Sequence, residues 1–101
     1  MRFLFKMSIP VEAGNRAAKD GFKVIQMILE QQKPEAAYFV AEGGNRTGFL
    51  VIDMKDASEL PAIAEPWFLA LNASIEVQPA MVAADLQKAG PAIERAVKTF
   101  G

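Results

Sequence analysis

The chain contains neither cysteine nor histidine. The absence of cysteine excludes disulfides, thiol nucleophiles and thiolate metal ligands, and it leaves the redox compartment undetermined. The absence of histidine excludes more, because histidine is the commonest acid–base group and metal ligand near neutral pH. Any catalysis must therefore use carboxylates, lysine, tyrosine, backbone groups or a cofactor that is brought in.

Concentrated charge of one sign is also absent. The 101 residues include 11 basic and 12 acidic ones, which gives a net charge of −1, and no basic stripe indicates nucleic-acid binding. No segment approaches the roughly 20 apolar residues that span a bilayer. The opening MRFLFKMSIP lacks the apolar run of a signal peptide. We therefore expect one soluble, cytoplasmic domain over residues 1–101, a size typical of single domains.

Alternating apolar residues predict four strands. In the first, Phe3, Phe5, Met7 and Ile9 form one face and Arg2, Leu4, Lys6 and Ser8 the other. Pro79 near the end of the last strand indicates an edge position, because proline cannot donate to a ladder. The predicted strands cover residues 3–9, 36–42, 47–54 and 74–80.

Three helices are predicted from apolar residues at helical spacing. The first runs from Val11 or Asn15 to Gln32. The second begins near Ser58 as its N-cap and is broken or restarted by Pro66. The third lies in the segment DLQKAGPAIERAVKTFG, where Gly90 and Pro91 should kink or split it. Its apolar face comprises Leu86, Ile93, Val97 and Phe100.

The only glycine pair lies in the segment AYFVAEGGNRTGFLVIDM. A phosphate-binding loop would need wider glycine spacing, a lysine and a following helix, but here a strand follows. We expect GGNR to be a hairpin loop, in which Gly43 and Gly44 adopt positive φ. Asn45 would support the turn, and Arg46 would be its solvated tip, with contact to a partner subunit as the alternative.

The resulting order, β-α-β-β-α-β plus a C-terminal helix, predicts an α+β fold of the ferredoxin-like type. The first and third strands should be central, and the second and fourth should form the edges. Both central strands are apolar on both faces, whereas a sheet with one wet face alternates cleanly. Something must therefore cover the second face. We favour a homodimer through that face, and the alternative is that the C-terminal helix folds back over it.

Several segments resemble one family in pattern. MRFLFKM before a proline, YFVAEGGN, FLVIDMKDASEL and EPWFLALNASIEVQPAM resemble strands and connections of the dimeric α/β-barrel superfamily, and within it muconolactone isomerase-like proteins. The superfamily also includes uncharacterised bacterial branches. The resemblance covers residues 1–81 and implies a cofactor-free pocket between sheet and helices for a small organic acid or aromatic compound. The branches that depend on histidine do not fit this chain.

The resemblance makes Glu42 and Lys6 the candidate catalytic residues. Glu42 would move a proton if it were partly buried, and Lys6 would hold negative charge on the substrate. The structural alternatives are a solvated glutamate and an ion pair of Lys6 with Asp53 or Glu76 on the neighbouring strands.

Four further residues are candidate ligand-binding residues: Tyr38, Asp53, Trp67 and Phe68. Tyr38 can donate a hydrogen bond, and Trp67 and Phe68 can form an apolar pocket wall. Core or dimer packing is the alternative for Trp67 and Phe68, and packing with a solvated hydroxyl group is the alternative for Tyr38. The carboxylates do not have the spacing of a calcium loop, so we expect no metal.

Two functions remain open. The first is a small-molecule-binding protein with cofactor-independent isomerase-like activity on a small organic acid or lactone. The second is a non-catalytic ligand-binding or assembly module of the same fold. Nucleic-acid binding would require exposed aromatics flanked by basic residues on the sheet, and the balanced charge disfavours it.

Overall fold

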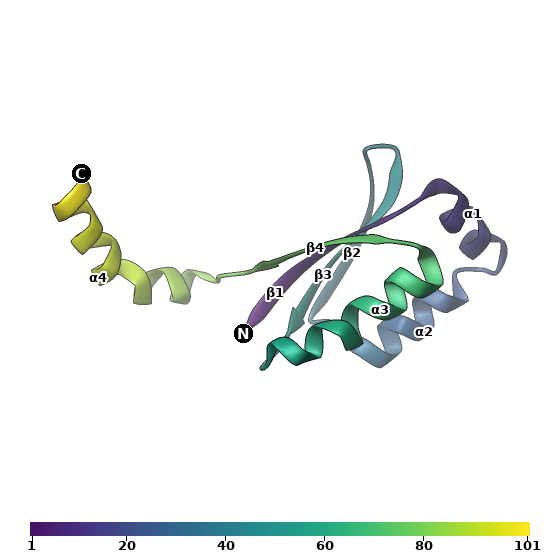
Figure 1. The fold of residues 1–101 in the computed structure, drawn as a ribbon, viewed down its shortest axis with the longest axis horizontal. Helices are drawn as coiled ribbons and strands as arrows, with labels where there is room; N and C mark the ends of the chain where they lie inside the picture. The colour runs from purple at the N-terminus through teal and green to yellow at the C-terminus, as the bar shows by residue number, and fades with distance from the viewer.

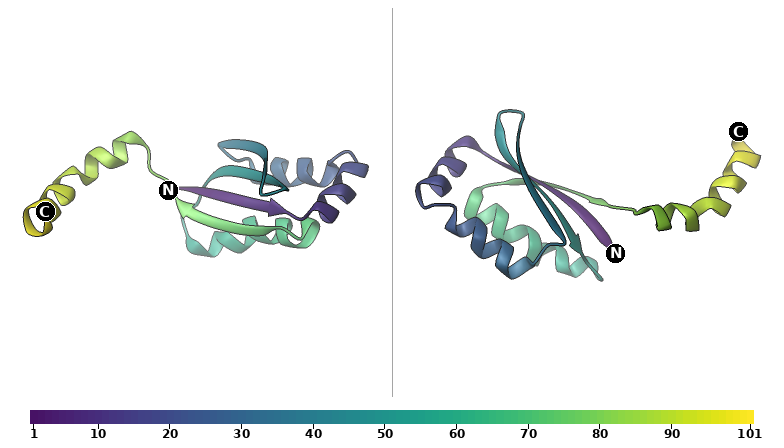
Figure 2. Two further views of the ribbon diagram at one scale, coloured as in Figure 1. Left: turned by 90° about the horizontal axis from the view of Figure 1, so that it is seen from above. Right: turned by 180° about the vertical axis from the view of Figure 1, so that it is seen from behind.

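The computed structural model describes all 101 residues as one four-stranded antiparallel sheet with four helices. The strand order is β2-β3-β1-β4, so the first and third strands are central, as expected. Helices α1, α2 and α3 lie on one face of the sheet, and α4 extends away from it (Figures 1 and 2). The elements are β1 (Arg2–Ile9), α1 (Val11–Lys19), α2 (Lys23–Gln32), β2 (Ala36–Glu42), β3 (Asn45–Asp53), the short 3-10 helix η1 (Ala57–Glu59), α3 (Leu60–Leu71), β4 (Ser74–Pro79) and α4 (Ala83–Phe100).

The core lies between the sheet and the three helices that cover it. Phe5 and Met7 of β1 and Leu50 of β3 are fully buried there. Trp67 of α3 is also 0% exposed, and its Nε1 donates a hydrogen bond to Oε1 of Gln32 at 3.1 Å. This bond satisfies the one polar group of the indole, as a buried tryptophan requires.

The opposite face of the sheet, here called the open face, carries no helix (Figure 2). Alternation along β1 places Leu4, Lys6 and Ser8 on it, and all three are partly exposed. The strand register adds side chains from the other three strands, and one row across the sheet comprises Tyr38, Phe49, Lys6 and Glu76.

The single helix predicted up to Gln32 is wrong, because the chain forms two helices there. Gly21 and Phe22 have positive φ values of 66° and 58°, which interrupt the helix after α1. Glycine adopts this conformation freely, whereas for a bulky residue it is a genuine outlier. The strain at Phe22 costs about 1 to 3 kcal/mol and must be offset by the packing around it.

The hairpin loop is shorter than the predicted GGNR. Only Gly43 and Gly44 form the turn, with φ values of 59° and 81°, and Asn45 already pairs with Glu42 in the ladder. Two-residue loops with both φ positive match the twist of the flanking strands. Arg46 is therefore a strand residue opposite Ile9, and the prediction that it is a solvated tip is wrong.

Two details of the second predicted helix are also wrong. Asp56, not Ser58, is the capping residue, and it caps the 3-10 helix η1 that leads into α3. Oδ1 of Asp56 accepts a hydrogen bond from the Ser58 N–H at 2.9 Å, and Glu59 Oε2 accepts one from the Asp56 N–H at 2.8 Å. This exchange is a capping box. Pro66 does not break α3, which continues to Leu71 because its buried residues anchor both halves to the core.

Helix α4 does not fold back over the open face, so that alternative is wrong. It runs past Gly90 and Pro91 without a break in the helix and bends along its length (Figure 1). It contains no buried residue. The molecule consequently measures 57 × 28 × 20 Å, with a radius of gyration of 17.0 Å, against about 13 Å for a compact chain of 100 residues. None of the helices combines the length and apolar character that a membrane crossing requires.

We predict that Trp67→Ala lowers the free energy of unfolding by about 3–5 kcal/mol, because it leaves a cavity in the core. Urea denaturation at a fixed protein concentration measures this loss. Phe68→Ala is the matched control on the same helix. Phe68 is 41% exposed, so its truncation should cost clearly less, and equal losses for the two variants would contradict this account of the core.

Candidate functional site

Lys6 and Glu42 meet on the open face. Nζ of Lys6 lies 2.6 Å from Oε2 of Glu42 and 3.5 Å from Oε2 of Glu76. Glu42 lies on β2 and Lys6 on β1, so their contact spans the intervening strand β3. Thr47 lies on β3 between them and is 1% exposed although no helix covers this face. The ion pair therefore ties three strands together over a buried threonine.

The electrostatics of this pair keep Lys6 charged. The hydrogen bond to Glu42 raises the pKa of Lys6 above its ordinary value of 10.5, against an opposing effect of desolvation. Glu76 adds a smaller electrostatic contribution in the same direction. A lysine held as an ammonium ion stabilises negative charge placed beside it.

Asp53 is not a partner of Lys6. The register places it opposite Arg2, at the far end of β3, and its Oδ1 lies 2.6 Å from the N-terminal ammonium group. This ammonium lowers the pKa of the Asp53 carboxyl, first through a hydrogen bond and then through its charge. Of the two acids proposed for Lys6, only Glu76 contacts it.

The other side of the sheet contains an apolar hollow with a volume of about 520 Å³. It lies where the hairpin end of the sheet passes α2. Phe22 and Phe39, 37% and 48% exposed, form aromatic parts of its wall, and Arg46 is its only charged lining residue. We refer to this site as the hollow; its lining residues are Ile9, Phe22, Ile25, Phe39, Val40, Ala41 and Arg46.

Arg46 reaches the hollow because α1 contains a glycine at the point of approach. A Cβ atom at Gly14 would lie 2.6 Å from Nη1 of Arg46. The same nitrogen donates a hydrogen bond to Oδ1 of Asn15 at 3.1 Å, and no carboxylate forms an ion pair with Arg46. The guanidinium group thus keeps free donors beside an apolar wall, an arrangement suited to a carboxylate.

The structure brings together only some of the predicted site residues. Tyr38 is on the open face in the same row as Lys6. Trp67 belongs to the core, which is the structural alternative, and Phe68 lies half-exposed on the outer side of α3. Neither aromatic residue of α3 lines the hollow.

Three lining residues of the hollow were not predicted as site residues from the sequence: Arg46, Phe22 and Phe39. For Arg46 a signal was available: a two-residue loop at Gly43 and Gly44 pairs Glu42 with Asn45 and so makes Arg46 a strand residue. The strained conformation of Phe22 has no signal in the sequence. No group of three or more acidic side chains is placed to hold a metal ion.

Comparison with known proteins places the chain in a family. Residues 1–94 match the family described as Domain of unknown function (DUF3303). The chain belongs to this family. The match includes the sheet, the hollow and α4 as far as Glu94, so the hollow and the Lys6–Glu42 ion pair both lie within the DUF3303 region.

No curated protein matches the chain. Among solved structures it is similar to a formyltetrahydrofolate deformylase from Pseudomonas putida KT2440, with 13% sequence identity and a TM-score of 0.48. The similar region covers 79% of this chain and 29% of the deformylase, so the chain spans less than a third of that enzyme's length. Neither match concerns muconolactone isomerase-like proteins, and that resemblance stays a prediction.

We predict that Glu42→Gln lowers the pKa of Lys6, because it removes the main interaction that raises it. The ¹³Cε chemical shift of Lys6, followed by NMR from pH 8 to pH 12 around the ordinary lysine pKa, measures this change. Glu76→Gln is the matched control, and it should lower the pKa less. A larger effect of Glu76→Gln would contradict the geometry.

The same shift has a consequence for stability. The pKa of Lys6 is raised in the folded state, so the ion pair contributes its full stabilisation of the fold at pH values below 10.5, the pKa of an unfolded lysine. This stabilisation is lost as the pH rises through the raised value. The difference in stability between wild type and Lys6→Met should therefore shrink at alkaline pH.

Proposed function

We propose that this DUF3303 chain is a small-molecule-binding protein of the ferredoxin-like, dimeric α/β-barrel type, and that its ligand is a small organic acid with an apolar body. The observation that carries this proposal is the hollow, an apolar cavity with a single guanidinium group that has no acidic partner. Ligand pockets have this composition, with mostly apolar walls and few polar groups that fix orientation.

The proposed binding mode follows from the lining. Arg46 binds the carboxylate through free N–H donors, and a planar carboxylate can accept two of them in parallel. Phe22 and Phe39 contact the apolar part of the ligand. A volume of about 520 Å³ lies within the usual range of pockets for small ligands, roughly 300–1,000 Å³.

Binding is better supported than isomerase chemistry. Glu42 is engaged in an ion pair with Lys6, in which its Oε2 lies 2.6 Å from Nζ of the lysine. Its side chain is also on the open face, whereas the hollow lies on the helix face. An isomerase-like reaction at Glu42 and Lys6 would require a second site on the open face, enclosed by another copy of the chain.

The proposed homodimer rests on the open face. Three helices cover the other face, and the partly exposed Leu4, Phe49 and Val51 remain without cover on this one. A second sheet of the same kind covers them with an equally apolar surface, in the self-complementary contact of a two-fold dimer.

We predict that phenylacetate binds the hollow more tightly than phenylacetamide, its neutral analogue of similar shape, because only the acid pairs with Arg46. Amide chemical-shift changes in NMR titrations locate the site and give both affinities. Arg46→Gln should reduce the preference for phenylacetate, and Arg2→Gln, at the other end of the sheet, should leave it unchanged. Equal affinities for acid and amide in the wild type would overturn the proposed ligand class.

We predict that light scattering of the wild-type chain gives twice the chain mass of 11.0 kDa. Val51→Lys introduces a charge on the open face and should shift the protein to the monomer, because burying an unpaired charge is costly. Leu69→Lys is the matched control, since Leu69 is exposed on α3. A monomeric wild type would overturn the dimer.

A further inference from the structure

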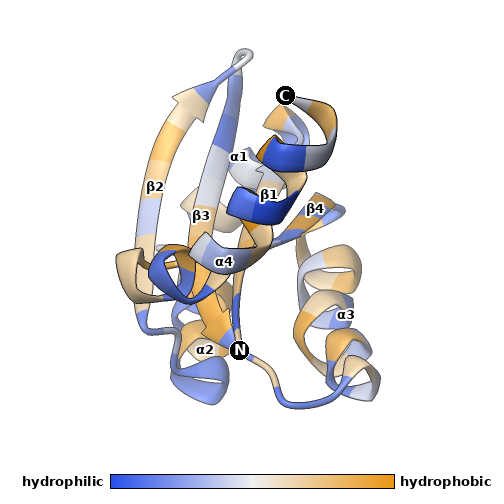
Figure 3. Ribbon diagram, turned by 90° about the vertical axis from the view of Figure 1, so that its left-hand side faces the viewer, coloured by the Kyte–Doolittle hydropathy of each residue, from blue (hydrophilic) through white to orange (hydrophobic).

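The apolar face of helix α4 packs against no other part of the chain. Leu86, Ile93, Val97 and Phe100 line one side of it at helical spacing, and Ile93 and Phe100 are 53% and 88% exposed. Figure 3 shows apolar and polar segments alternating along the helix. Most of the stability of a helix in a protein comes from the packing of its amphipathic face, and interior glycine and proline cost about 1 and about 3 kcal/mol relative to alanine. A helix that contains Gly90 and Pro91 therefore needs a surface to pack against.

The hollow lacks a wall on its outer side. A pocket normally encloses about 70–90% of its ligand, but Phe22 and Phe39 present much of their rings to solvent. Phe39 belongs to β2, which is an edge strand, so nothing lies beyond it in the sheet. Each chain therefore has a helix, α4, whose apolar face packs against nothing, and an apolar hollow that is open on its outer side.

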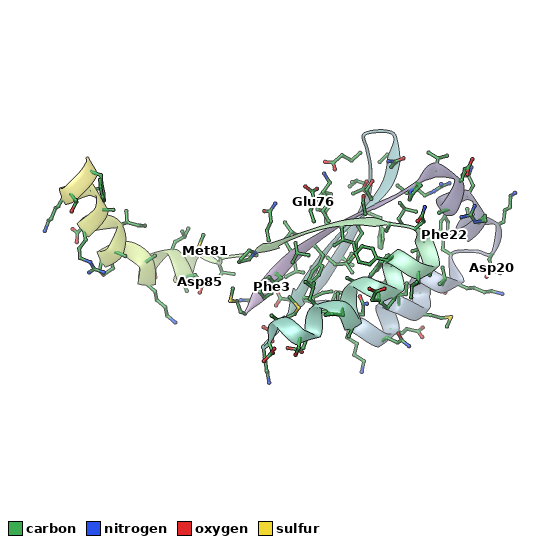
Figure 4. All side chains as sticks on the ribbon, in the orientation of Figure 1. Phe3, Asp20, Phe22, Glu76, Met81 and Asp85 are labelled. Atoms are coloured by element: carbon green, nitrogen blue, oxygen red, sulfur yellow. The ribbon has the colours of Figure 1, made fainter.

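These two features cannot meet within one chain. β4 ends at Pro79, which pairs with Phe3 near the start of β1, whereas the hollow includes Ile9 at the end of β1 and Ala41 on the opposite edge strand. The two features thus lie at diagonally opposite corners of the sheet. Figure 4 shows Phe22 at one end of the molecule and Met81 and Asp85, at the start of α4, toward the other.

In a dimer, α4 of one copy can reach the hollow of the other copy. Packed sheets commonly have their strands either nearly aligned or nearly perpendicular. In the perpendicular arrangement, a two-fold axis along the other diagonal of the sheet places the corner where α4 begins in one copy over the corner that holds the hollow in the other copy. Each α4 then begins beside the hollow of the other copy. Its 18 residues span about 27 Å, enough to pass the edge of β2 and lie across the mouth of the hollow.

We propose that α4 is an exchanged arm that closes the hollow of a second copy of this chain, so that the ligand site is complete only in the dimer. The apolar face of α4 covers Phe22 and Phe39, and its polar face, with Lys88 and Arg95, stays in solvent. This inference rests on the proposed dimer and deepens the proposed ligand site, because the second copy supplies its missing wall.

Paramagnetic NMR on mixed dimers tests the arm. The chain has no cysteine, so Arg95→Cys accepts a single nitroxide on the polar face of α4. Copies that carry the nitroxide but no ¹⁵N are mixed with ¹⁵N-labelled wild-type copies. Only the wild-type amides are observed, so any broadening of their signals reports a contact between copies. The amides of Phe22, Phe39 and Ala41 should lose most of their intensity, and the amide of Asp56, at the far end of the sheet, should retain it.

Variants of α4 provide the control. Ile93→Asp combined with Val97→Asp places charges on the apolar face and should abolish the broadening and weaken phenylacetate binding several-fold. Lys88→Gln, on the polar face, should change neither. Neither set of substitutions touches the core, because α4 contains no buried residue.

The possible failures are distinguishable. A wild-type chain that scatters as a monomer overturns the dimer and the arm together. A dimer whose Phe22, Phe39 and Ala41 amides keep their intensity overturns the arm alone. A dimer that shows the broadening but does not bind phenylacetate supports the arm and overturns the proposed ligand.

Discussion

Side chains alternate between the two faces of each strand, and this two-residue repeat decides which groups in the molecule can meet. On β2, Ala41 faces the hollow while its neighbour Glu42 faces the opposite side and binds Lys6. Glu42 is accordingly not among the lining residues of the hollow. The ion pair and the cavity are therefore separate features, although their residues are adjacent in the sequence.

The helices cover the sheet unequally, and most of the remaining structure follows from this. Three helices on one face leave the edge strand β2 partly uncovered on that side and the open face uncovered on the other. Apolar residues on both surfaces then require cover that the chain does not provide for itself. The apolar face of α4 also needs a surface to pack against, since the helix contains no buried residue. In the proposed dimer, a second copy satisfies all three requirements with one symmetric contact.

Much of the fold could be predicted from the sequence because the strand pattern is strong. The alternation in residues 3–9 and the glycine pair gave the sheet and its edges. The site could not be predicted in the same way, because it depends on details that periodicity does not encode. Arg46 was assigned to a loop because the turn was taken as four residues, and the φ of 58° at Phe22 contradicts local preference altogether. Pro66 is a further case, since buried neighbours outweighed its preference to end a helix.

The ion pair and the hollow remain mechanically connected through β2. Lys6 binds Glu42 across β3, and this contact fixes the hairpin end of an edge strand whose outer side has no partner. Ala41 and Arg46 pair directly across that hairpin, and both line the hollow. Under the proposed function, Arg46 presents its guanidinium group from β3, the strand that the Lys6–Glu42 contact crosses. In that proposal, the charged pair on the open face is a positioning element for the ligand site on the other face.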